Sequence, residues 1–140
     1  MEITTEYLTE IFREYNKLYF NGELPLPQFR LLKSYRTLGF FSCKKIIGRR
    51  RLKGTTIEIS CRFDWDESVL RDVMVHEMIH YYLAFKHIDN QITHGEAFMQ
   101  MSEDFNKRFG LNITVEVDNS KSKPSSNASP LAFLFAKYIW

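Results

Sequence analysis

The sequence predicts one α+β domain, built from a mixed three-stranded sheet, a central helix and two flanking helices. Its length of 140 residues is enough for one domain with its own hydrophobic core. Three short stretches in the first half of the chain are typical of strands, and polar and apolar residues alternate most clearly in residues 56–60. Apolar residues recur at helical spacing before these stretches and again after them.

The first element is expected to be an amphipathic helix over residues 5–20, because apolar side chains recur there at helical spacing. Thr4 or Thr5 can cap its first turn, and Asn21-Gly22 can stop it. Strands are then expected over residues 28–34, 37–43 and 55–61.

The central helix is expected to be buried, because apolar side chains lie on most of its sides. Asp64 has the position of an N-cap, with Glu67 three residues later, and the helix is expected to run to about Lys86. Asp72 lies near its start. We interpret Asp72 as a surface carboxylate, and a contact with a metal-binding histidine is the alternative.

The last helix of the domain is predicted from two signals at its ends. Thr93 and Glu96 have the spacing of a capping box, which places His94 at the first helical position. Gly110 is expected to end the helix in the usual C′ position. Residues 113–117 are then expected to form one more short strand.

The middle of the central helix carries an H-E-x-x-H run, formed by His76, Glu77 and His80. Residues four apart share one face of a helix, so the two imidazoles point the same way and can bind one zinc ion. The Glu77 carboxylate can then reach a water on that zinc. Polar side chains inside a buried helix are costly unless something satisfies them. A core helix with two hydrogen-bonded histidines is the alternative interpretation.

A catalytic zinc takes three protein ligands and leaves a fourth position open. We prefer His94 as the third ligand, because a histidine beside a glycine at a helix start has little structural purpose. Glu96 and Glu103 stay open as alternatives, since either would complete a set of two histidines and one glutamate. His87 does not have the spacing from His80 that the metzincin pattern requires.

A strongly basic stretch, residues 44–54, separates the last two expected strands, and six of its eleven residues are Lys or Arg. We expect a hairpin tip, which is either a solvated loop or a finger that contacts phosphates near the active site. The candidate nucleic-acid contacts are Lys44, Lys45, Arg49, Arg50, Arg51 and Lys53.

Six segments together form a recognisable pattern. They are Tyr15-Asn16, Tyr19-Phe20-Asn21-Gly22-Glu23-Leu24-Pro25, Leu38-Gly39, Ile57-Glu58-Ile59-Ser60, His76-Glu77-Met78-Ile79-His80 and His94-Gly95-Glu96-Ala97-Phe98. With these segments the chain resembles the SprT-like family, which includes bacterial SprT proteins and the eukaryotic Spartan proteases that cut proteins crosslinked to DNA. The resemblance extends over about residues 5–117. It implies a zincin-like fold, one zinc on His76, His80 and His94, and Glu77 as the general base.

The domain is expected to cover residues 1–117. Residues 118–130 are predicted to be a polar linker, and residues 131–140 are strongly apolar. Many SprT-like proteins carry a cysteine-rich zinc ribbon after this domain, and none is visible in this sequence. The apolar segment would either dock on the domain or be the start of a zinc ribbon that is missing from this chain.

Composition places the chain among globular proteins, with 44% hydrophobic and 15% aromatic residues and no stretch that approaches the length of a membrane span. Residues 1–6 are polar and acidic, unlike a signal peptide. Cys43 and Cys61 lack metal-type spacing and are interpreted as reduced structural residues. We expect a monomer in the cytoplasm, or in the nucleus of a eukaryote.

The expected activity is zinc-dependent hydrolysis of peptide bonds in a protein or peptide substrate, with DNA as a candidate partner. An extended substrate would pair with the strand at residues 55–60 as an edge of the sheet, and Tyr81 is interpreted as a packed side chain. Two other classes stay open: a DNA-binding module with a structural or vestigial zinc site, and a metal hydrolase that acts on a small molecule. Glu77 argues against a structural zinc, because a closed site needs four ligands and no base.

Overall fold

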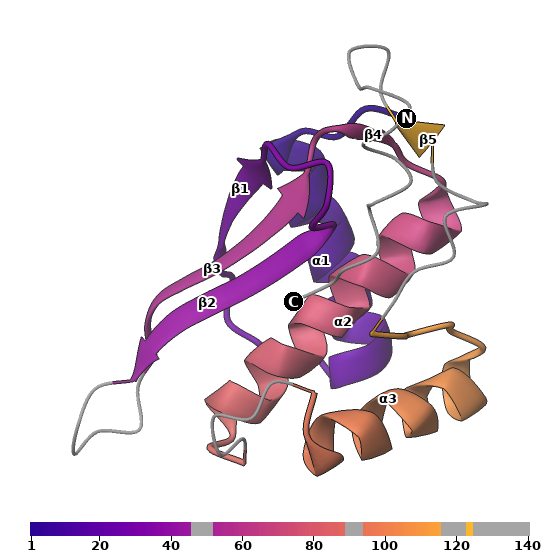
Figure 1. Ribbon diagram of the computed structural model, residues 1–140. Coiled ribbons are helices and arrows are strands. Elements are labelled where there is room, and N and C mark those ends of the chain that lie inside the picture. Colours follow the sequence, from indigo (N-terminus) through magenta and orange to yellow (C-terminus); the bar gives the residue numbers. More distant parts are fainter. Residues whose placement is uncertain (46–51, 89–93, 116–122, 125–140) are drawn as a thin grey trace.

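The structure is a computed structural model of the chain, and it describes residues 1–45, 52–88, 94–115 and 123–124. Helices and strands combine in one α+β domain, as the sequence predicts (Figure 1). In chain order the described elements are α1 (Thr5–Phe20), β1 (Gln28–Leu32), β2 (Gly39–Lys45), β3 (Leu52–Ser60), β4 (Phe63–Asp64), α2 (Glu67–Phe85), α3 (Glu96–Phe109) and β5 (Lys123–Pro124).

The main sheet has the strand order β1-β3-β2, with β1 parallel and β2 antiparallel to β3. The prediction of a mixed three-stranded sheet is therefore confirmed. The expectation that residues 55–60 form a sheet edge is wrong, because β3 is the central strand and β1 and β2 are the edges. Alternation of polar and apolar residues indicates which faces a strand buries and is silent on its neighbours within the sheet.

The strand boundaries differ from the expected ones by up to three residues. β2 continues to Lys45 and β3 begins at Leu52, because these two residues still pair across the hairpin. The ladder of backbone hydrogen bonds thus extends into the basic stretch. Periodicity of apolar residues could not indicate this extension, since the paired side chains there are mostly polar.

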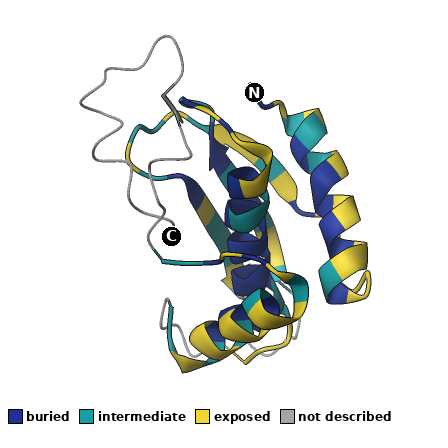
Figure 2. Ribbon diagram, turned by 90° about the vertical axis from the view of Figure 1, so that its right-hand side faces the viewer, coloured by how far each residue is buried: buried dark blue, intermediate teal, exposed yellow. Residues whose placement is uncertain are grey.

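The two longest helices, α1 and α2, lie on one face of the sheet. Phe29, Ile57 and Phe41 are neighbours across the three strands, so their side chains share a face. Phe29 contacts Phe12 of α1, whereas Phe41 stacks on Tyr81 of α2 with ring centroids 5.4 Å apart. The core therefore lies between the sheet and the two helices, and buried residues cover nearly all sides of α2 (Figure 2).

α1 forms as the sequence predicts. The Thr4 hydroxyl accepts a hydrogen bond from the Tyr7 backbone N–H at 3.1 Å, and Asn21 ends the helix in the left-handed conformation with φ of 54°. An asparagine tolerates this conformation better than most residues, which is why the Asn21-Gly22 pair is a good stop signal. One face of α1 is buried and the other is exposed (Figure 2).

The start of α2 differs from the expected one. Asp66, and not Asp64, is the N-cap, and its carboxylate accepts hydrogen bonds from the backbone N–H groups of Ser68 and Val69. Asp64 lies in β4 and forms an ion pair with the amino group of Met1. Spacing alone could not separate the two candidates, because both aspartates precede the same run of apolar residues.

α3 also begins later than expected. Gly95 is its N-cap and makes no side-chain capping bond, so the predicted capping box between Thr93 and Glu96 is not the start signal. His94 lies before the helix and not at its first position. Gly110 ends the helix with a left-handed φ of 68°, as predicted. Aromatic contacts hold α3 against the end of α1, and they include Tyr19–Phe109 and Phe20–Phe105.

In the described part of the chain after α3, residues 113–115, the strand that was expected over residues 113–117 does not form. Residues 113–115 are neither helical nor extended in a sheet, and residues 116–117 lie outside the described part. The expected linker 118–130 is described only at β5, which pairs with β4, and the apolar segment 131–140 lies outside the described residues. Within the described residues, no helix is long and apolar enough to cross a membrane.

Candidate metal centre

Three imidazoles meet beside the middle of α2. His76 and His80 lie one helical turn apart, and His94 approaches them from the turn before α3. Nε2 of His76 lies 3.0 Å from Nε2 of His94 and 3.2 Å from Nε2 of His80. The structure therefore brings together all three histidines that the sequence singled out as ligands.

The spacing of these nitrogens suits one metal ion. Nitrogens bound at 2.0–2.1 Å to a tetrahedral zinc lie about 3.4 Å apart, slightly more than the separations found here. A small outward movement of the rings would create the required space. Hydrogen bonding among the rings does not by itself account for this convergence, because a ring nitrogen carries either one proton or one lone pair, whereas Nε2 of His76 faces two other imidazoles. The group could thus hold a metal ion.

The orientation of His76 is determined by its other ring nitrogen. Nδ1 lies 3.0 Å from the backbone carbonyl oxygen of Thr114, in the loop that follows α3. A carbonyl can only accept, so Nδ1 carries the proton and donates it. Nε2 then keeps its lone pair and directs it toward the other two histidines. This arrangement, with the second nitrogen donating to a carbonyl, is the usual one for metal-binding histidines.

His94 reaches the site through an unusual backbone conformation. Its φ of 58° lies in the left-handed region, which a residue with a Cβ rarely adopts. The conformation lets the chain turn sharply just before the N-cap Gly95. Such local strain persists where the surrounding structure compensates for it, and it is concentrated at functional sites.

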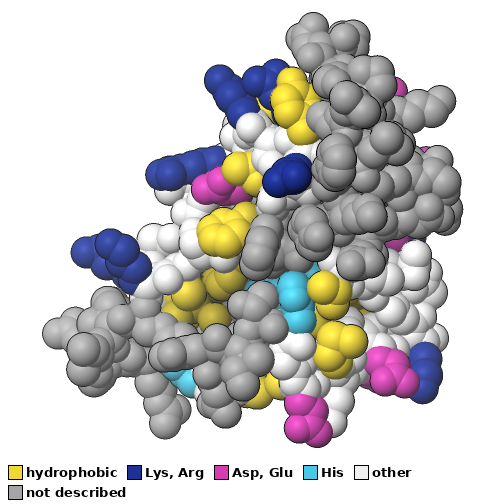
Figure 3. Space-filling view, viewed as in Figure 1, with side chains coloured by type: hydrophobic (Ala, Val, Ile, Leu, Met, Phe, Trp, Pro, Cys, Tyr) yellow, Lys and Arg dark blue, Asp and Glu magenta, His cyan; other side chains and the backbone are white. Residues whose placement is uncertain are grey.

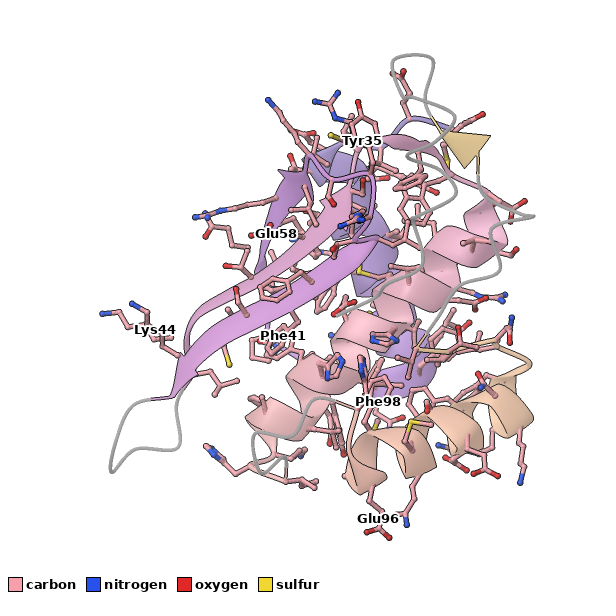
Figure 4. All side chains as sticks on the ribbon, in the orientation of Figure 1. Tyr35, Phe41, Lys44, Glu58, Glu96 and Phe98 are labelled. Carbon is pink, nitrogen blue, oxygen red and sulfur yellow. The ribbon has the colours of Figure 1, made fainter. Side chains whose placement is uncertain are left out.

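Phe98 forms an apolar floor under the three rings. It stacks on His80 with ring centroids 4.4 Å apart, and it also contacts His76 at 4.7 Å and His94 at 5.0 Å. The side chain lies directly beside the imidazoles, on the first turn of α3 (Figure 4). Because Phe98 touches every ring, it limits how far any of them can rotate away from the common point.

Glu77 is fully buried beside this cluster, and none of the described residues gives its carboxylate a partner. Neither Oε1 nor Oε2 has a hydrogen-bond partner in the described part of the chain, although the residue is 0% exposed. Buried carboxylates without partners are rare and costly. The observation calls for a group that the described residues do not supply, such as a water molecule held at the metal position.

Gly39 makes the position of Glu77 possible. A Cβ atom at Gly39 would lie 2.9 Å from Oε2 of Glu77, closer than real Cβ contacts, and 3.0 Å from Cγ1 of Val73. β2 therefore approaches α2 closely at its first residue, and a larger residue there would require the Glu77 side chain to move. A glycine inside a strand pattern often marks such a close approach.

Burial shifts the acid–base properties of the site in a consistent direction. Burial, reinforced by the neighbouring His80 and His94, holds the pKa of His76 well below its ordinary value. Burial and the nearby His94 lower the pKa of His80 to about 3, and burial alone lowers the pKa of His94. All three rings therefore stay neutral near pH 7, which is the form that binds metals. Burial raises the pKa of Glu77 well above its ordinary value.

The alternative third ligands point elsewhere. Glu96 is exposed and accepts a hydrogen bond from Gln100 at 3.1 Å, and its side chain points away from the histidines (Figure 4). Glu103 is exposed and pairs with Lys107. His87 is exposed and does not belong to the cluster. Among the described residues, His94 is the only one of the four candidates that lies with His76 and His80.

The site is open to solvent on one side. Histidine side chains are visible at the surface between hydrophobic side chains in the space-filling view (Figure 3). Among the cluster, His94 is the more exposed residue, whereas His76 and His80 are buried. A group bound by the three nitrogens could therefore also be reached from outside.

Two further residues named from the sequence are structural. Tyr81 is packed, as expected: its hydroxyl donates to the Pro25 carbonyl at 3.0 Å, and burial raises its pKa to about 12. Asp72 is partly buried, and its carboxylate accepts from the Asn112 backbone N–H at 3.3 Å and from Arg71. Asp72 therefore supports the loop after α3, whereas the Nδ1 atom of His76 faces a different acceptor, the Thr114 carbonyl.

The basic stretch is described only at its two ends. Lys44 and Lys53 are exposed and pair in the β2–β3 register, so they flank the hairpin tip on opposite strands. Arg49, Arg50 and Arg51 lie outside the described residues, as does the side chain of Lys45. The structure therefore places two of the six candidate nucleic-acid contacts side by side and leaves the role of the stretch a prediction.

Some contributors to the site carried little signal in the sequence. Thr114 acts through its backbone carbonyl, which any residue would offer, so its identity could not reveal it. Gly39 did carry a signal, because it interrupts a strand pattern. Phe98 stood out only through its spacing from His94, four residues away along the chain.

The fold and the histidine cluster define an α+β domain with a candidate metal site on a buried helix. The sequence model of the SprT-like family matches residues 8–117, most of the chain, and the protein belongs to that family. The family consists in general of metalloprotease-type domains. No curated protein and no solved structure gave a significant match.

Proposed function

We propose that this protein is a zinc-dependent metallopeptidase with a zincin-like catalytic domain. The observation that carries the proposal is the convergence of three histidine nitrogens beside a fully buried carboxylate, which has no partner among the described residues and lies on the helix that carries two of the histidines. Histidine nitrogens are good zinc ligands, and three of them leave a fourth position for water and substrate. His76, His80 and His94 would hold the ion.

The chemistry divides between the metal and Glu77. A bound zinc would supply Lewis acidity toward the scissile carbonyl and would acidify water at the open position. Glu77 acts as the general base: an Oε atom takes the proton from the attacking water and later delivers it to the leaving amine. The raised pKa of the buried Glu77 carboxyl, caused by desolvation, moves it toward the range in which one group can serve both steps.

An extended peptide is the substrate shape that the architecture favours. β2 is an edge strand of the main sheet, and it begins at Gly39, next to Glu77. An edge strand offers unpaired backbone N–H and C=O groups, which can add a peptide as a further strand. A peptide paired with β2 would run past the metal position, so the proposed substrate edge is β2 and not the central strand.

The proposed substrates include proteins associated with DNA, in the cytoplasm or in a nucleus. The support is the family membership together with Lys44 and Lys53, which are exposed at the base of the basic hairpin tip. We further propose that the protein acts as a monomer.

The decisive experiment measures bound metal and proteolysis in the same samples. Purified protein should contain about one zinc, and Glu77→Gln should keep that zinc while losing about 10²–10⁴-fold in hydrolysis, because an amide cannot accept the proton of water. His87→Asn is the matched control, because it replaces an exposed histidine that lies outside the cluster. His87 has a left-handed φ of 56°, and asparagine tolerates this conformation.

Each outcome separates the proposal from its rivals. Zinc without any hydrolysis in the wild type would favour a DNA-binding module with a structural site. Hydrolysis of small esters or amides without cleavage of an unfolded protein would favour a small-molecule hydrolase. Turnover by Glu77→Gln at the wild-type rate would remove Glu77 from the mechanism.

A further inference from the structure

The loop after α3 supplies the backbone carbonyl that orients His76. Residues 110–114 belong to no helix or strand, so no ladder of backbone hydrogen bonds holds them. Nevertheless, the Thr114 carbonyl lies 3.0 Å from Nδ1 of the fully buried His76. Something other than secondary structure must hold this loop in place, because a shift of about one ångström would break the contact.

Asn106, in the last turns of α3, holds the residue just before Thr114. Its side-chain Nδ2 donates to the Ile113 carbonyl at 3.1 Å, and its Oδ1 accepts from the Ile113 backbone N–H at 2.7 Å. One side chain thus satisfies both backbone groups of one residue, as a neighbouring strand would. The orientation of the amide is determined by these partners, because the carbonyl can only accept and the N–H can only donate.

Asp72 and two apolar side chains give this loop further support. The Asp72 carboxylate accepts from the Asn112 backbone N–H at 3.3 Å, which joins the loop to the first half of α2. Leu111 and Ile113 are both buried in the core. These contacts are less direct than the pair made by Asn106, because Asp72 bonds a residue farther from Thr114 and the apolar side chains make no hydrogen bond to the backbone beside it.

We propose that Asn106 is a positioning residue for the metal centre. By holding Ile113 it sets the Thr114 carbonyl, the carbonyl fixes the protonated Nδ1 of His76, and Nε2 is thereby presented to the metal. The inference rests on the proposed function, in which His76 is a ligand. It assigns a role in metal binding to a side chain that never touches the metal.

Asparagine is the side chain that this role requires. An aspartate at position 106 would keep the acceptor for the Ile113 N–H and would place a second oxygen against the Ile113 carbonyl. Alanine would remove both bonds. Asn106→Asp therefore replaces one bond with a repulsive contact between two oxygens and Asn106→Ala removes both bonds, with the helix preserved in both.

The fold contains a matched control for this arrangement. Asn16 of α1 holds Leu24 in the same way: Nδ2 donates to the Leu24 carbonyl at 2.9 Å, and Oδ1 accepts from its N–H at 3.2 Å. The loop that Asn16 holds contains no histidine and contacts α2 through Tyr81. Asn16→Ala removes equivalent bonds from the fold and leaves the orientation of His76 alone.

The test compares zinc affinity with stability. The zinc dissociation constant of each variant is measured by competition with a chromophoric chelator, and the metal-free stability by urea unfolding. We expect Asn106→Ala to weaken zinc binding about tenfold or more, as removal of an outer partner of a ligand histidine does elsewhere. Asn106→Asp should also weaken it, because its second oxygen repels the Ile113 carbonyl. Asn16→Ala should lose comparable stability and keep the wild-type zinc affinity. Cobalt substitution adds a spectroscopic signature, because the visible bands of the cobalt-bound Asn106 variants should change and those of Asn16→Ala should not.

The outcomes distinguish this inference from the proposed function. A wild-type protein that binds no zinc overturns both. A wild type that binds zinc and cleaves protein, with an Asn106→Ala variant of equal affinity, overturns the positioning role alone. Equal losses of affinity in Asn106→Ala and Asn16→Ala also overturn it, because the effect would then follow general stability. If Asn106→Ala does not fold, Asn106→Asp decides by the same comparison.

Discussion

At the scale of single residues, the site depends on two close approaches. Nitrogen atoms of three histidines lie about as near to one another as a shared metal requires, and the buried Glu77 carboxylate lies against the backbone of Gly39. Neither contact is favourable by itself. Three similar nitrogen groups face one another at the histidines, and the Glu77 carboxylate is buried without a partner among the described residues. Both make sense if a metal and a water complete the site.

Gly39→Ala should abolish the proposed hydrolysis and leave the proposed metal bound. The new Cβ would lie 2.9 Å from Oε2 of Glu77, so the carboxylate must move, whereas the nearest atoms around that Cβ belong to Glu77 and Val73 and not to a histidine. A misplacement of about 1 Å in a catalytic group can cost on the order of 10²-fold in rate. Hydrolysis rate and zinc content, measured together, check this expectation.

Gly22→Ala is the control for this substitution. Gly22 has a left-handed φ of 71°, and a Cβ added there would meet open space, so alanine costs stability through the backbone and touches nothing in the site. Equal loss of activity in both variants would mean that Gly39 matters for folding and not for the placement of Glu77.

At the scale of elements, α2 combines a structural and a chemical task. It is buried on nearly all sides, begins at a capping aspartate and carries two of the histidines and Glu77 in its middle. A helix enclosed in this way holds its polar side chains in fixed rotamers, because neighbouring atoms leave no room for others. The flanking elements then add what α2 lacks: Gly39 from β2, and His94 and Phe98 from the start of α3.

The cap of α2 provides a test of the element itself. Asp66→Ala should lower the free energy of unfolding by about 1 kcal/mol, the usual cost of losing an N-cap side chain. Asp64→Ala should cost less, because its ion pair with the amino group of Met1 is largely exposed. Urea unfolding of both variants shows which substitution lowers the free energy of unfolding more. A larger loss for Asp64→Ala would indicate that Asp64, the residue suggested by the sequence spacing, caps α2.

The hairpin between β2 and β3 provides a second test at this scale. Lys44 and Lys53 flank its tip, and reversing Arg49, Arg50 and Arg51 to Glu should abolish a weak, salt-sensitive binding to DNA while zinc content stays the same. Labelled single-stranded and duplex DNA are titrated at two salt concentrations. Lys107 and Arg108 on α3, reversed together, show how binding responds to a lower net charge at a site away from the hairpin.

That expectation has a clear contrary result. If the wild type does not bind at low salt, or if the triple variant binds as well as the wild type, the stretch is a solvated loop. If the α3 control loses binding to the same degree, the effect belongs to the overall charge of the protein and not to the hairpin.

At the scale of the whole molecule, the proposed metal joins segments that are far apart in the sequence. His76 and His80 belong to α2, His94 precedes α3, and Thr114 follows it. A ligand that binds only the folded state raises the free energy of unfolding according to its concentration relative to its dissociation constant. The metal should therefore stabilise the domain as a whole.

Removal of the metal checks this expectation. Chelation should lower the melting temperature of the wild type, and zinc at about 100 times its dissociation constant should restore about 2.7 kcal/mol. His94→Ala should lose the zinc and show no response to the chelator. Full zinc occupancy in His94→Ala, together with loss of zinc in Glu96→Ala or Glu103→Ala, would mean that the third ligand is a glutamate.

The sequence by itself determined the class of fold, the three helices, the mixed sheet and the histidines that could share a metal. These features depend on local patterns: helical spacing of apolar residues, capping and stop residues, and the four-residue step that puts His76 and His80 on one face. Such patterns act over one or two turns of chain, so they can be found without knowing what lies across the core.

Only the tertiary structure decided the relations between segments distant in sequence. It made β3 central and β2 the edge beside the site, left Glu96 and Glu103 facing solvent, and placed Gly39 against Glu77 and the Thr114 carbonyl against His76. The physical reason is that strand order, and contacts made by a backbone carbonyl or by a missing Cβ, depend on packing across the core. Packing of that kind leaves little or no mark on the local order of residue types.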